Sequence, residues 1–201
     1  MIKEARIVSV MSLFPLPQYV VVLEDKEKTK LVPIWIGVNE GNAIALEMQG
    51  EKFPRPLTHD LMVIILKTLN AQVEKVVVSD LKDSSYYAII YLQFNGKMLS
   101  IDARPSDSLA LAVRLRCPIF IDESVLKKCP HIEGPVKQDE IEKFKGALKT
   151  MSPEEFFKKL EETSSAPGGE SQHPFGESSV EEDDEEDDDE EDEAGGEEEK
   201  W

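Results

Sequence analysis

The chain has 201 residues, with 23 Lys and Arg against 41 Asp and Glu, and its formal net charge is −18 at pH 7. The charge is concentrated in residues 164–201, which hold 18 of the acidic residues and a single lysine. Residues 1–163 are close to neutral and contain nearly all the apolar residues. A chain of this length can bury one substantial core, but its acidic end has too little apolar surface to fold alone. We therefore expect one folded body and a disordered acidic tail over residues 164–201.

The sequence lacks the signals of membrane-spanning and secreted proteins. Its apolar runs, such as residues 19–23 and 61–66, are far shorter than the roughly 20 residues that a bilayer-spanning helix needs. The first residues lack the apolar core and cleavage site of a secretory signal. Cys117 and Cys129 lack C-x-x-C spacing and are expected to be ordinary thiols. We therefore expect a cytoplasmic protein with no membrane partner.

Three strands are predicted at the start of the body. Residues 5–13, 18–25 and 29–36 are rich in Val, Ile, Leu and aromatic residues, and polar loops separate them. The second and third strands are expected to form a hairpin. Both are apolar at successive positions, which predicts that helices or another subunit cover both of their faces.

Two helices are predicted to follow this hairpin. Residues 38–49 place apolar side chains at helical spacing and end at Gly50, a common C-terminal stop. The second helix covers residues 60–70, with Thr58 as its predicted N-terminal cap. Its apolar residues occupy nearly all of its faces, which is typical of a helix buried in the centre of a protein.

The second half of the body is predicted to begin with an antiparallel meander. Asn95-Gly96 is a strong hairpin signal, and apolar strands flank it on both sides. The expected ranges are, in chain order, strands at 73–81, 86–94 and 97–101, a helix at 106–116, a strand at 119–121 and a helix at 122–128. This order of elements indicates an α+β fold, with a largely antiparallel sheet or sheets and helices packed on and between them.

Two amphipathic helices are predicted beyond the body, at residues 137–150 and 153–162. The second begins with Ser152 as a cap, followed by a proline and a capping-box glutamate. Phe156 and Phe157 are expected to pack on the body. Three parts are therefore predicted: a domain at residues 1–132, a helical extension at residues 133–163, and the acidic tail.

Polar residues of chemical interest form three clusters, each at a point where a strand or loop enters a helix. The clusters are Gly37-Val38-Asn39-Glu40 with Glu47, Arg55-Pro56-Leu57-Thr58-His59-Asp60, and Asp102-Ala103-Arg104-Pro105-Ser106-Asp107. Backbone N–H groups and the dipole at a helix start favour anions such as phosphate. An enzymatic role requires that these clusters meet in one cleft that is open to solvent.

The charged residues of these clusters have two interpretations, and the sequence leaves both open. Asp60, Asp102 and Asp107 can hold a Mg2+ or Mn2+ ion, the usual aid to phosphodiester hydrolysis. Arg55 and Arg104 would then steady a phosphate. In the alternative, the carboxylates stabilise helix starts, and Arg104 pairs with Asp60 or Asp102 to pin the elements together.

Standard catalytic signatures are absent. The sequence has no P-loop, no G-x-G-x-x-G, no G-x-S-x-G and no H-E-x-x-H, so no organic cofactor is expected. Its three histidines also exclude a histidine-rich metal site. His59 remains the histidine of interest, either as a proton donor or acceptor or as an exposed residue of the first helical turn.

Several stretches of the sequence share the motifs, order and spacing of one known family. They are Ile36-Gly37-Val38-Asn39-Glu40, Ala43-Ile44, Arg55-Pro56-Leu57-Thr58-His59-Asp60-Leu61, Tyr87-Ala88, Asp102-Ala103-Arg104-Pro105-Ser106-Asp107-Ser108 and Pro118-Ile119-Phe120. Over residues 1 to about 130 the chain resembles the bifunctional nuclease domain family. Gly41 and Ser108 stand where we expect the family to favour alanine, and neither departure affects a site.

The resemblance implies an α+β fold, oligomeric assembly and, for some plant relatives, nuclease activity on both DNA and RNA. It does not identify the catalytic residues, so their roles follow from residue chemistry. The candidate catalytic residues are His59, Asp60, Arg104 and Asp107, the candidate substrate-binding residues are Arg55, Thr58 and Ser106, and the candidate metal ligands are Asp60, Asp102 and Asp107.

The charge distribution limits how the chain can bind nucleic acid. A nearly neutral body has no basic excess for phosphates, so binding must be local or metal-mediated. Arg114 and Arg116 with Lys127 and Lys128 form either a basic patch or ordinary solvated charge. The acidic tail either competes with nucleic acid for a positive groove or keeps the protein soluble. Two alternatives to a nuclease stay open. The protein is a non-catalytic oligomeric module that binds a small anion or a protein partner, or its motifs serve only to brace subunit contacts.

Overall fold

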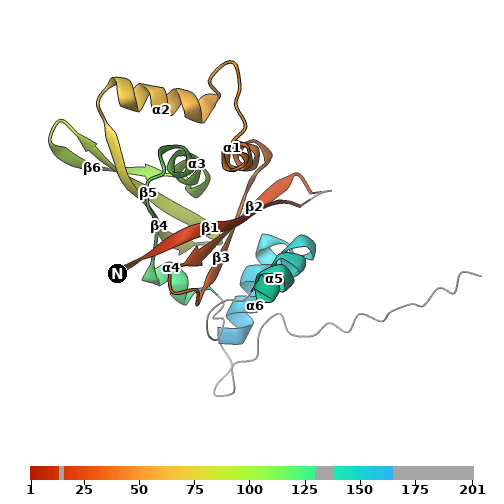
Figure 1. Cartoon of the computed structure of the whole chain (residues 1–201). Coiled ribbons are helices and arrows are strands. Elements are labelled where there is room, and N and C mark those ends of the chain that lie inside the picture. Colours follow the sequence, from red (N-terminus) through yellow and green to blue (C-terminus); the bar gives the residue numbers. More distant parts are fainter. Residues whose placement is uncertain (14–15, 130–137, 165–201) are drawn as a thin grey trace, which may run out of the picture.

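Seven strands form one sheet within the part of the chain that the structure describes (Figure 1). The structure is a computed structural model, and it describes residues 1–13, 16–129 and 138–164. The strands are β1 (Ile2–Ser12), β2 (Gln18–Asp25), β3 (Leu31–Gly37), β4 (Gln72–Lys82), β5 (Ser85–Phe94), β6 (Lys97–Ala103) and β7 (Ile119–Asp122). Their spatial order is β3-β2-β1-β7-β4-β5-β6, and only β4 and β7 pair in parallel. The mixed, mostly antiparallel sheet confirms the predicted α+β fold.

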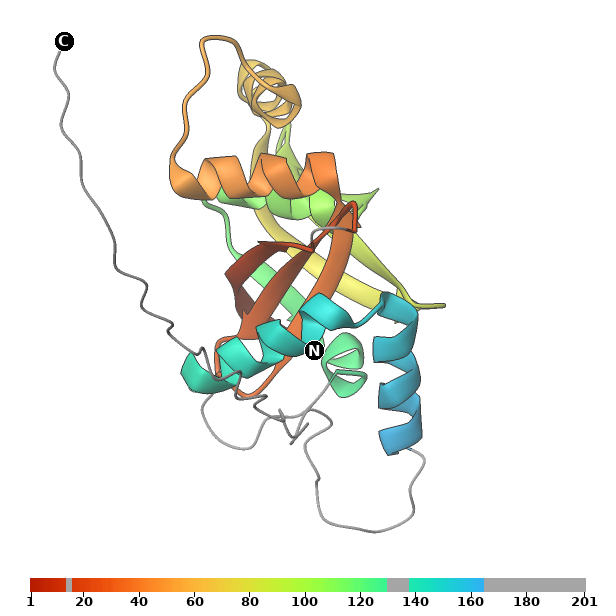
Figure 2. The same ribbon diagram turned by 90° about the vertical axis from the view of Figure 1, so that its right-hand side faces the viewer.

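Six helices are described, and they divide between the two faces of the sheet. They are α1 (Val38–Gln49), α2 (Thr58–Thr68), α3 (Pro105–Leu115), α4 (Glu123–Lys127), α5 (Gln138–Thr150) and α6 (Pro153–Ser164). Helices α1 and α3 lie over one face, and α5 and α6 lie beneath the other (Figures 1 and 2). No helix in the described ranges is both long and apolar enough to cross a bilayer. The predicted acidic tail and the boundary near residue 132 lie outside the described residues.

Both faces of strands β2 and β3 are buried, as their unbroken apolar sequences predict. Side chains alternate between the two faces of a strand. Val21 and Leu23 therefore enter the core that α1 and α3 cover, whereas Val20 and Val22 enter a second core. That second core also contains Phe156 and other residues of α5 and α6. Helices cover both faces, so this part of the chain needs no second subunit to bury its strands.

Local sequence signals account for most element ends. Asn95 and Gly96 both have positive φ, as the tight turn between β5 and β6 requires. The Asp122 carboxylate accepts the backbone N–H of Ser124 at 2.9 Å and caps α4. The predicted cap of α2 is wrong, because the N-cap residue is Leu57 rather than Thr58. The two cysteines are free thiols, as predicted.

Helix α2 differs from its predicted position. Its nearly all-apolar sequence predicts a central, buried helix, but only His59 and Val63 of α2 are buried. The helix packs on α3 at the outside of the molecule and does not lie on the sheet (Figure 1). One narrow stripe of α2 therefore faces the protein, and the remaining apolar residues face outward.

The helical extension is joined to the sheet by an aromatic cluster. The ring centroids of Trp35 and Phe156 are 5.3 Å apart, and those of Tyr86 and Phe157 are 6.0 Å apart. Phe156 is fully buried. The backbone N–H of Ser152 and the carboxylate of Glu155 form the predicted capping box at 2.8 Å, which starts α6 at this cluster.

Replacing Phe156 by alanine is expected to lower the free energy of unfolding by about 3–5 kcal/mol, because the lost aromatic ring leaves a cavity. Urea denaturation followed by circular dichroism measures this change. Phe53→Ala is the control, because Phe53 is half exposed, and we expect a change of about 1 kcal/mol or less. Equal effects of the two substitutions would contradict the packing of α6 on the sheet.

Candidate functional site

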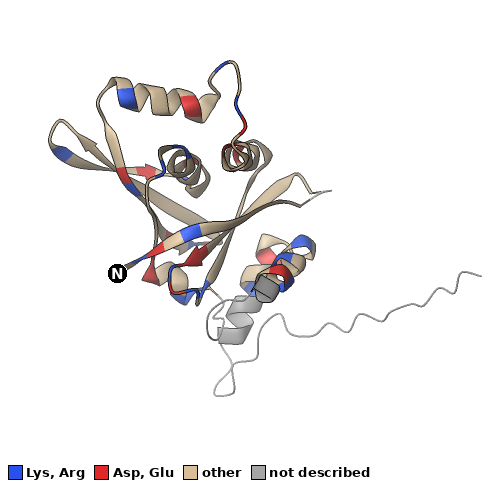
Figure 3. Ribbon diagram, in the orientation of Figure 1, with Lys and Arg blue, Asp and Glu red and all other residues tan. Residues whose placement is uncertain are grey.

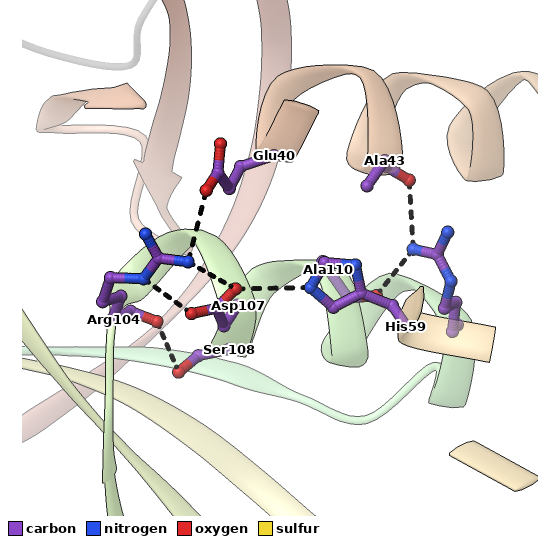
Figure 4. A network of polar contacts seen from close by, with 8 residues as sticks. Glu40, Ala43, His59, Arg104, Asp107, Ser108 and Ala110 are labelled. Atoms are coloured by element: carbon purple, nitrogen blue, oxygen red, sulfur yellow. Dashed lines mark hydrogen bonds and ion pairs between the residues drawn. The ribbon is translucent and has the colours of Figure 1, made fainter. Parts of the chain in front are cut away.

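The three polar clusters of the sequence meet where α1, α2 and α3 begin (Figure 4). Asp107 is the central residue: its Oδ2 accepts a hydrogen bond from Arg104 Nε at 2.8 Å, and its Oδ1 lies 3.3 Å from His59 Nε2. The Nη2 of Arg104 also lies 3.2 Å from Glu40 Oε1. We call Glu40, His59, Arg104 and Asp107 the polar network. It contains one residue from the first cluster, one from the second and two from the third.

The start of α3 sets the geometry of Arg104 and Asp107. Pro105 is the first residue of α3, and a proline holds the preceding residue in an extended conformation. Arg104 accordingly has φ −68° and ψ 146°, and its carbonyl accepts the Ser108 hydroxyl at 3.0 Å. Asp107 lies in the first helical turn, three residues from Arg104. The motif therefore places the guanidinium and the carboxylate side by side before any tertiary contact forms.

The polar network ranges from exposed to buried. The Arg104 side chain is 66 % exposed, that of Asp107 is 28 % exposed and that of His59 is 10 % exposed. The hydrogen bond that Arg104 donates to the Asp107 carboxylate raises the pKa of the guanidinium above its ordinary value, so Arg104 stays charged. Two carboxylates surround this one guanidinium. The exposed Arg104 guanidinium is thus the part of the network that solvent reaches most easily.

The surroundings of His59 and Arg104 differ from those expected if the polar clusters only stabilise helix starts. His59 is buried and not an exposed first-turn residue, because α2 turns it toward α3. Arg104 pairs with Glu40 and Asp107, whereas that interpretation paired it with Asp60 or Asp102. Arg104 joins the starts of α1 and α3 through carboxylates other than those predicted, and α2 joins them through the contact of His59 with Asp107.

Asp60 belongs to a separate ion pair with Arg114. Its Oδ1 accepts Arg114 Nε at 2.7 Å, and its Oδ2 accepts the backbone N–H of Leu57 at 2.9 Å, which caps α2. Arg114 Nη1 donates to the carbonyls of Ala43 and Ala110, each at 3.0 Å. The hydrogen bond from Arg114 is the main cause that lowers the pKa of Asp60 below its ordinary value of 3.8. The Asp60–Arg114 pair joins α1, α2 and α3, so we assign Asp60 a structural role.

Arg114 is a residue whose importance the sequence interpretation missed. Its side chain is 5 % exposed, so it belongs neither to a basic patch nor to solvated surface charge. One signal was present: Asp107 and Arg114 are seven residues apart, about two turns of one helix face. That spacing predicts two polar residues on the face of α3 that meets α1 and α2.

The predicted metal ligands do not form one donor set. Asp60 is bonded to Arg114, Asp107 is bonded to Arg104, and Asp102 lies on the exposed edge strand β6. No group of three or more His, Cys, Asp or Glu side chains suited to a metal ion occurs in the described residues. A divalent ion would have to displace arginine from these carboxylates. We therefore derive no step through a metal ion.

A cleft of about 490 Å³ opens beside the polar network. It lies between β3, the β4–β5 turn, β5, the end of β6 and the start of α3. Three predicted site residues line the cleft: Asp102, Arg104 and Ser106. Glu40 and Pro153 also belong to its lining. His59 and Asp107 lie behind Arg104, outside this lining. Arg104 is therefore the residue that connects the cleft to the buried histidine.

Arg55 and Thr58 lie apart from this cleft. Both are exposed, in the loop before α2 and at its first residue, and neither contributes to the cleft lining. In the described ranges, neither residue forms an ion pair with another side chain. The structure thus brings together five of the eight predicted site residues at the cleft or the network: His59, Asp102, Arg104, Ser106 and Asp107.

The described residues thus form an α+β body with an arginine–carboxylate–histidine network beside a cleft. Residues 21–133 match the family described as the bifunctional nuclease domain. The chain belongs to this family, as its motifs indicated.

Two groups of relatives are similar to the chain. An uncharacterized protein found in two strains of Mycobacterium tuberculosis is 37% identical over 162 residues, which are 76% of this chain and 97% of that protein. Bifunctional nuclease 1 of Oryza sativa subsp. indica is 22% identical over 113 residues, which are 54% of this chain and 34% of that protein. Bifunctional nuclease of Oryza minuta matches to the same extent.

Replacing Arg114 by methionine is expected to lower the free energy of unfolding by about 2–3 kcal/mol without any ligand present. The substitution leaves Asp60 without its ion pair and removes the hydrogen bonds that the guanidinium donates to the carbonyls of Ala43 and Ala110. Thermal and urea denaturation measure the change. Arg116→Met is the control, because Arg116 is exposed at the end of α3, and an equal loss there would contradict the bracing role of Arg114.

Asp60 also predicts an acid-dependent loss of stability. Its pKa is lower in the folded state than in the unfolded state, so its contribution is fully present above about pH 4 and disappears as the pH falls through the folded-state value. The difference in unfolding free energy between the wild type and Asp60→Asn should therefore shrink as the pH falls below 3.8. Asp83→Asn, in an exposed turn, is the control. A difference that does not change with pH would contradict this assignment.

Proposed function

We propose that the protein hydrolyses phosphodiester bonds of DNA or RNA, with the polar network as its reactive centre. The observation that carries the proposal is the contact of His59 with Asp107, which in turn holds Arg104 at the edge of a cleft. Membership of the family and the names of the rice relatives support the same chemistry. The side-chain contacts and the family comparison support the proposal separately, because the contacts are read from the structure and the family is read from the sequence.

His59 is the proposed proton donor or acceptor. A carboxylate that contacts one ring nitrogen fixes the orientation of an imidazole, so Asp107 is suited to position His59 for proton transfer. Such a histidine typically accelerates hydrolysis by 10²–10⁴-fold. Its burial behind Arg104 means that substrate reaches it only when the guanidinium moves or binds the phosphate itself.

Arg104 is the proposed phosphate ligand. Its exposed guanidinium lines the cleft, and charge that develops on a phosphoryl oxygen is stabilised by a fixed cation. Ser106 and the start of α3 lie in the same lining, where the positive end of the helix dipole favours an anion. Arg55 and Thr58 are proposed to contact the substrate outside the cleft, at the exposed loop before α2.

Substrate binding is expected to be local and only weakly sensitive to salt. The folded body has no basic excess, and Glu40, Asp102 and Asp107 surround Arg104 with negative charge. Few phosphates can therefore be neutralised, and affinity depends on few released counterions. A Mg2+ or Mn2+ ion would offset this negative charge only by displacing arginine from these carboxylates.

Purified protein should cleave single- or double-stranded DNA or RNA, and His59→Asn and Asp107→Asn should each reduce the rate by about 100-fold or more. Gel assays of labelled oligonucleotides measure the rates with Mg2+, with Mn2+ and with EDTA. Glu47→Gln, on the same face of α1 as Glu40, is the matched control and should cleave at the wild-type rate. Equal cleavage by all variants would indicate a contaminating enzyme and contradict the proposal.

A second function is favoured by one feature of the site. The guanidinium of Arg104 is already held by Glu40 and Asp107, and His59 does not line the cleft. A network of this kind also serves a non-catalytic module that binds a small anion or a protein partner at the cleft. Absence of cleavage by the wild type, together with a lower melting temperature for Asp107→Asn, would favour this second function.

A further inference from the structure

The cleft lies between two strand edges that no strand among the described residues covers. Strand β3 is the last strand at one end of the sheet and pairs with β2 on its other side. Strand β5 begins at residue 85, but its pairing with β6 begins only at Ala88, which is opposite Ala103. Residues 34–37 of β3 and 85–87 of β5 all line the cleft. The cleft therefore continues the path of β6 beyond the last residue of that strand.

The backbone of Trp35 points away from β2, toward the free edge of β3. Opposite residues of an antiparallel pair alternate between those that exchange hydrogen bonds and those that do not. The N–H of Asp25 donates to the Lys30 carbonyl at 3.2 Å beside the β2–β3 turn, which sets this alternation. Counted from that pair, Trp35 is opposite Val20 at a position without ladder bonds. Pro33 has the same orientation, as expected of a proline on an edge strand.

The backbone of Tyr86 lies at the free edge of β5. The β4–β5 turn consists of Asp83 and Ser84, both with positive φ, as in the two-residue turns that join strands at a hydrogen-bonded pair. That pair is Lys82 with Ser85, so Tyr86 occupies the next position, which has no ladder bonds to β4. Its N–H and C=O therefore face the side on which β6 has already ended.

We propose that the cleft binds an extended peptide segment of a partner protein, which adds a strand between β3 and β5 and carries a Lys or Arg beside Asp102. Such a strand pairs with the free backbone groups of both edges, and these main-chain bonds provide the affinity. From its rise, the strand spacing and the sheet thickness, one residue of a strand fills about 160 Å³. The cleft of about 490 Å³ therefore accommodates about three residues.

The charges of the cleft favour a basic segment. Its lining has three charged residues, Glu40, Asp102 and Arg104. Arg104 is paired with Glu40 and Asp107. Asp102 is exposed and forms no ion pair in the part of the chain that the structure describes, so it is the carboxylate that a basic side chain can meet. The acidic residues 165–201 of this chain are unsuited to the cleft, because they would add negative charge beside Asp102.

The other side chains of the segment are expected to be apolar. Strand β3 contains no Lys, Arg, Asp or Glu and is tan throughout in Figure 3. Side chains of an added strand lie beside those of β3 on the same faces of the sheet. Apolar or β-branched residues therefore suit every position of the segment except the one beside Asp102.

This proposal goes beyond the proposed hydrolysis and does not rest on it. Strand addition uses the edges of β3 and β5, whereas hydrolysis uses His59, which lies behind Arg104 and outside the cleft lining. A strand in the cleft would cover Arg104, so peptide and phosphate would compete for the same opening. Peptide binding is measured without nucleic acid, and its failure would leave the proposed hydrolysis untouched.

Amide hydrogen exchange of the full chain, followed by NMR, tests the proposal. The probe is the acetylated and amidated peptide Thr-Val-Lys-Val-Thr at millimolar concentration. It should slow exchange of the Trp35 and Tyr86 amides by about 10-fold or more, because both amides would then donate to the peptide. The amide of Ser100 is the internal control, since the same alternation directs it to the outer edge of β6, and its exchange should not change.

Two modified peptides test the backbone pairing and the charge. The same peptide with both valines N-methylated should slow neither amide, because methyl groups on one edge prevent it from lying between two strands. Thr-Val-Glu-Val-Thr should bind about 10-fold more weakly than the Lys peptide, because its carboxylate would face Asp102. Asp102→Lys should reverse this preference, and Glu51→Lys, an exposed position outside the cleft lining, should keep it.

Three results would overturn the proposal. The first is unchanged exchange of Trp35 and Tyr86 with the Lys peptide, and the second is equal protection by the N-methylated peptide. The third is equal binding of the Lys and Glu peptides. Protection of both amides by an oligonucleotide in place of the peptide would also overturn it, because the occupant of the cleft would then be nucleic acid.

Discussion

Helix α3 holds the ion pairs on which the helical side of the protein depends. Near its start, Asp107 binds Arg104 and His59, and two turns later Arg114 binds Asp60 and the Ala43 carbonyl of α1. Both groups of contacts lie on the side of α3 that faces α1 and α2. Without them, α2 would be attached mainly through Val63 and its neighbouring stripe. The charged residues of α3 thus join the three helices.

In the candidate site, Asp107 has two structural roles. Asp107 must keep Arg104 and Glu40 together, and it must also orient His59 if the network transfers protons. Carboxylates that are already bonded to arginine are poor metal ligands, because a cation would have to break an existing pair. Arg104 has the greatest freedom of the four, since most of its side chain is in solvent at the edge of the cleft.

Helix α2 links the site to the outside of the molecule. One stripe carries His59 inward, and the other consists of apolar side chains that water surrounds in a single chain. A protein gains free energy by covering such an apolar surface. Helix α2 therefore combines a buried histidine with an uncovered apolar surface.

The sequence alone determined the elements that depend on neighbouring residues. Runs rich in Val, Ile, Leu and aromatic residues predicted the strands, and Asn95-Gly96 predicted the β5–β6 turn. The polar motifs at the predicted helix starts indicated the family. The sequence could not determine which charges pair, because Arg114 meets Asp60 only after α2 and α3 pack together. It also predicted a buried α2, since apolar periodicity shows that a helix needs cover but not whether its own chain supplies it. Those outcomes depend on contacts between residues far apart in the chain, and only the tertiary structure decided them.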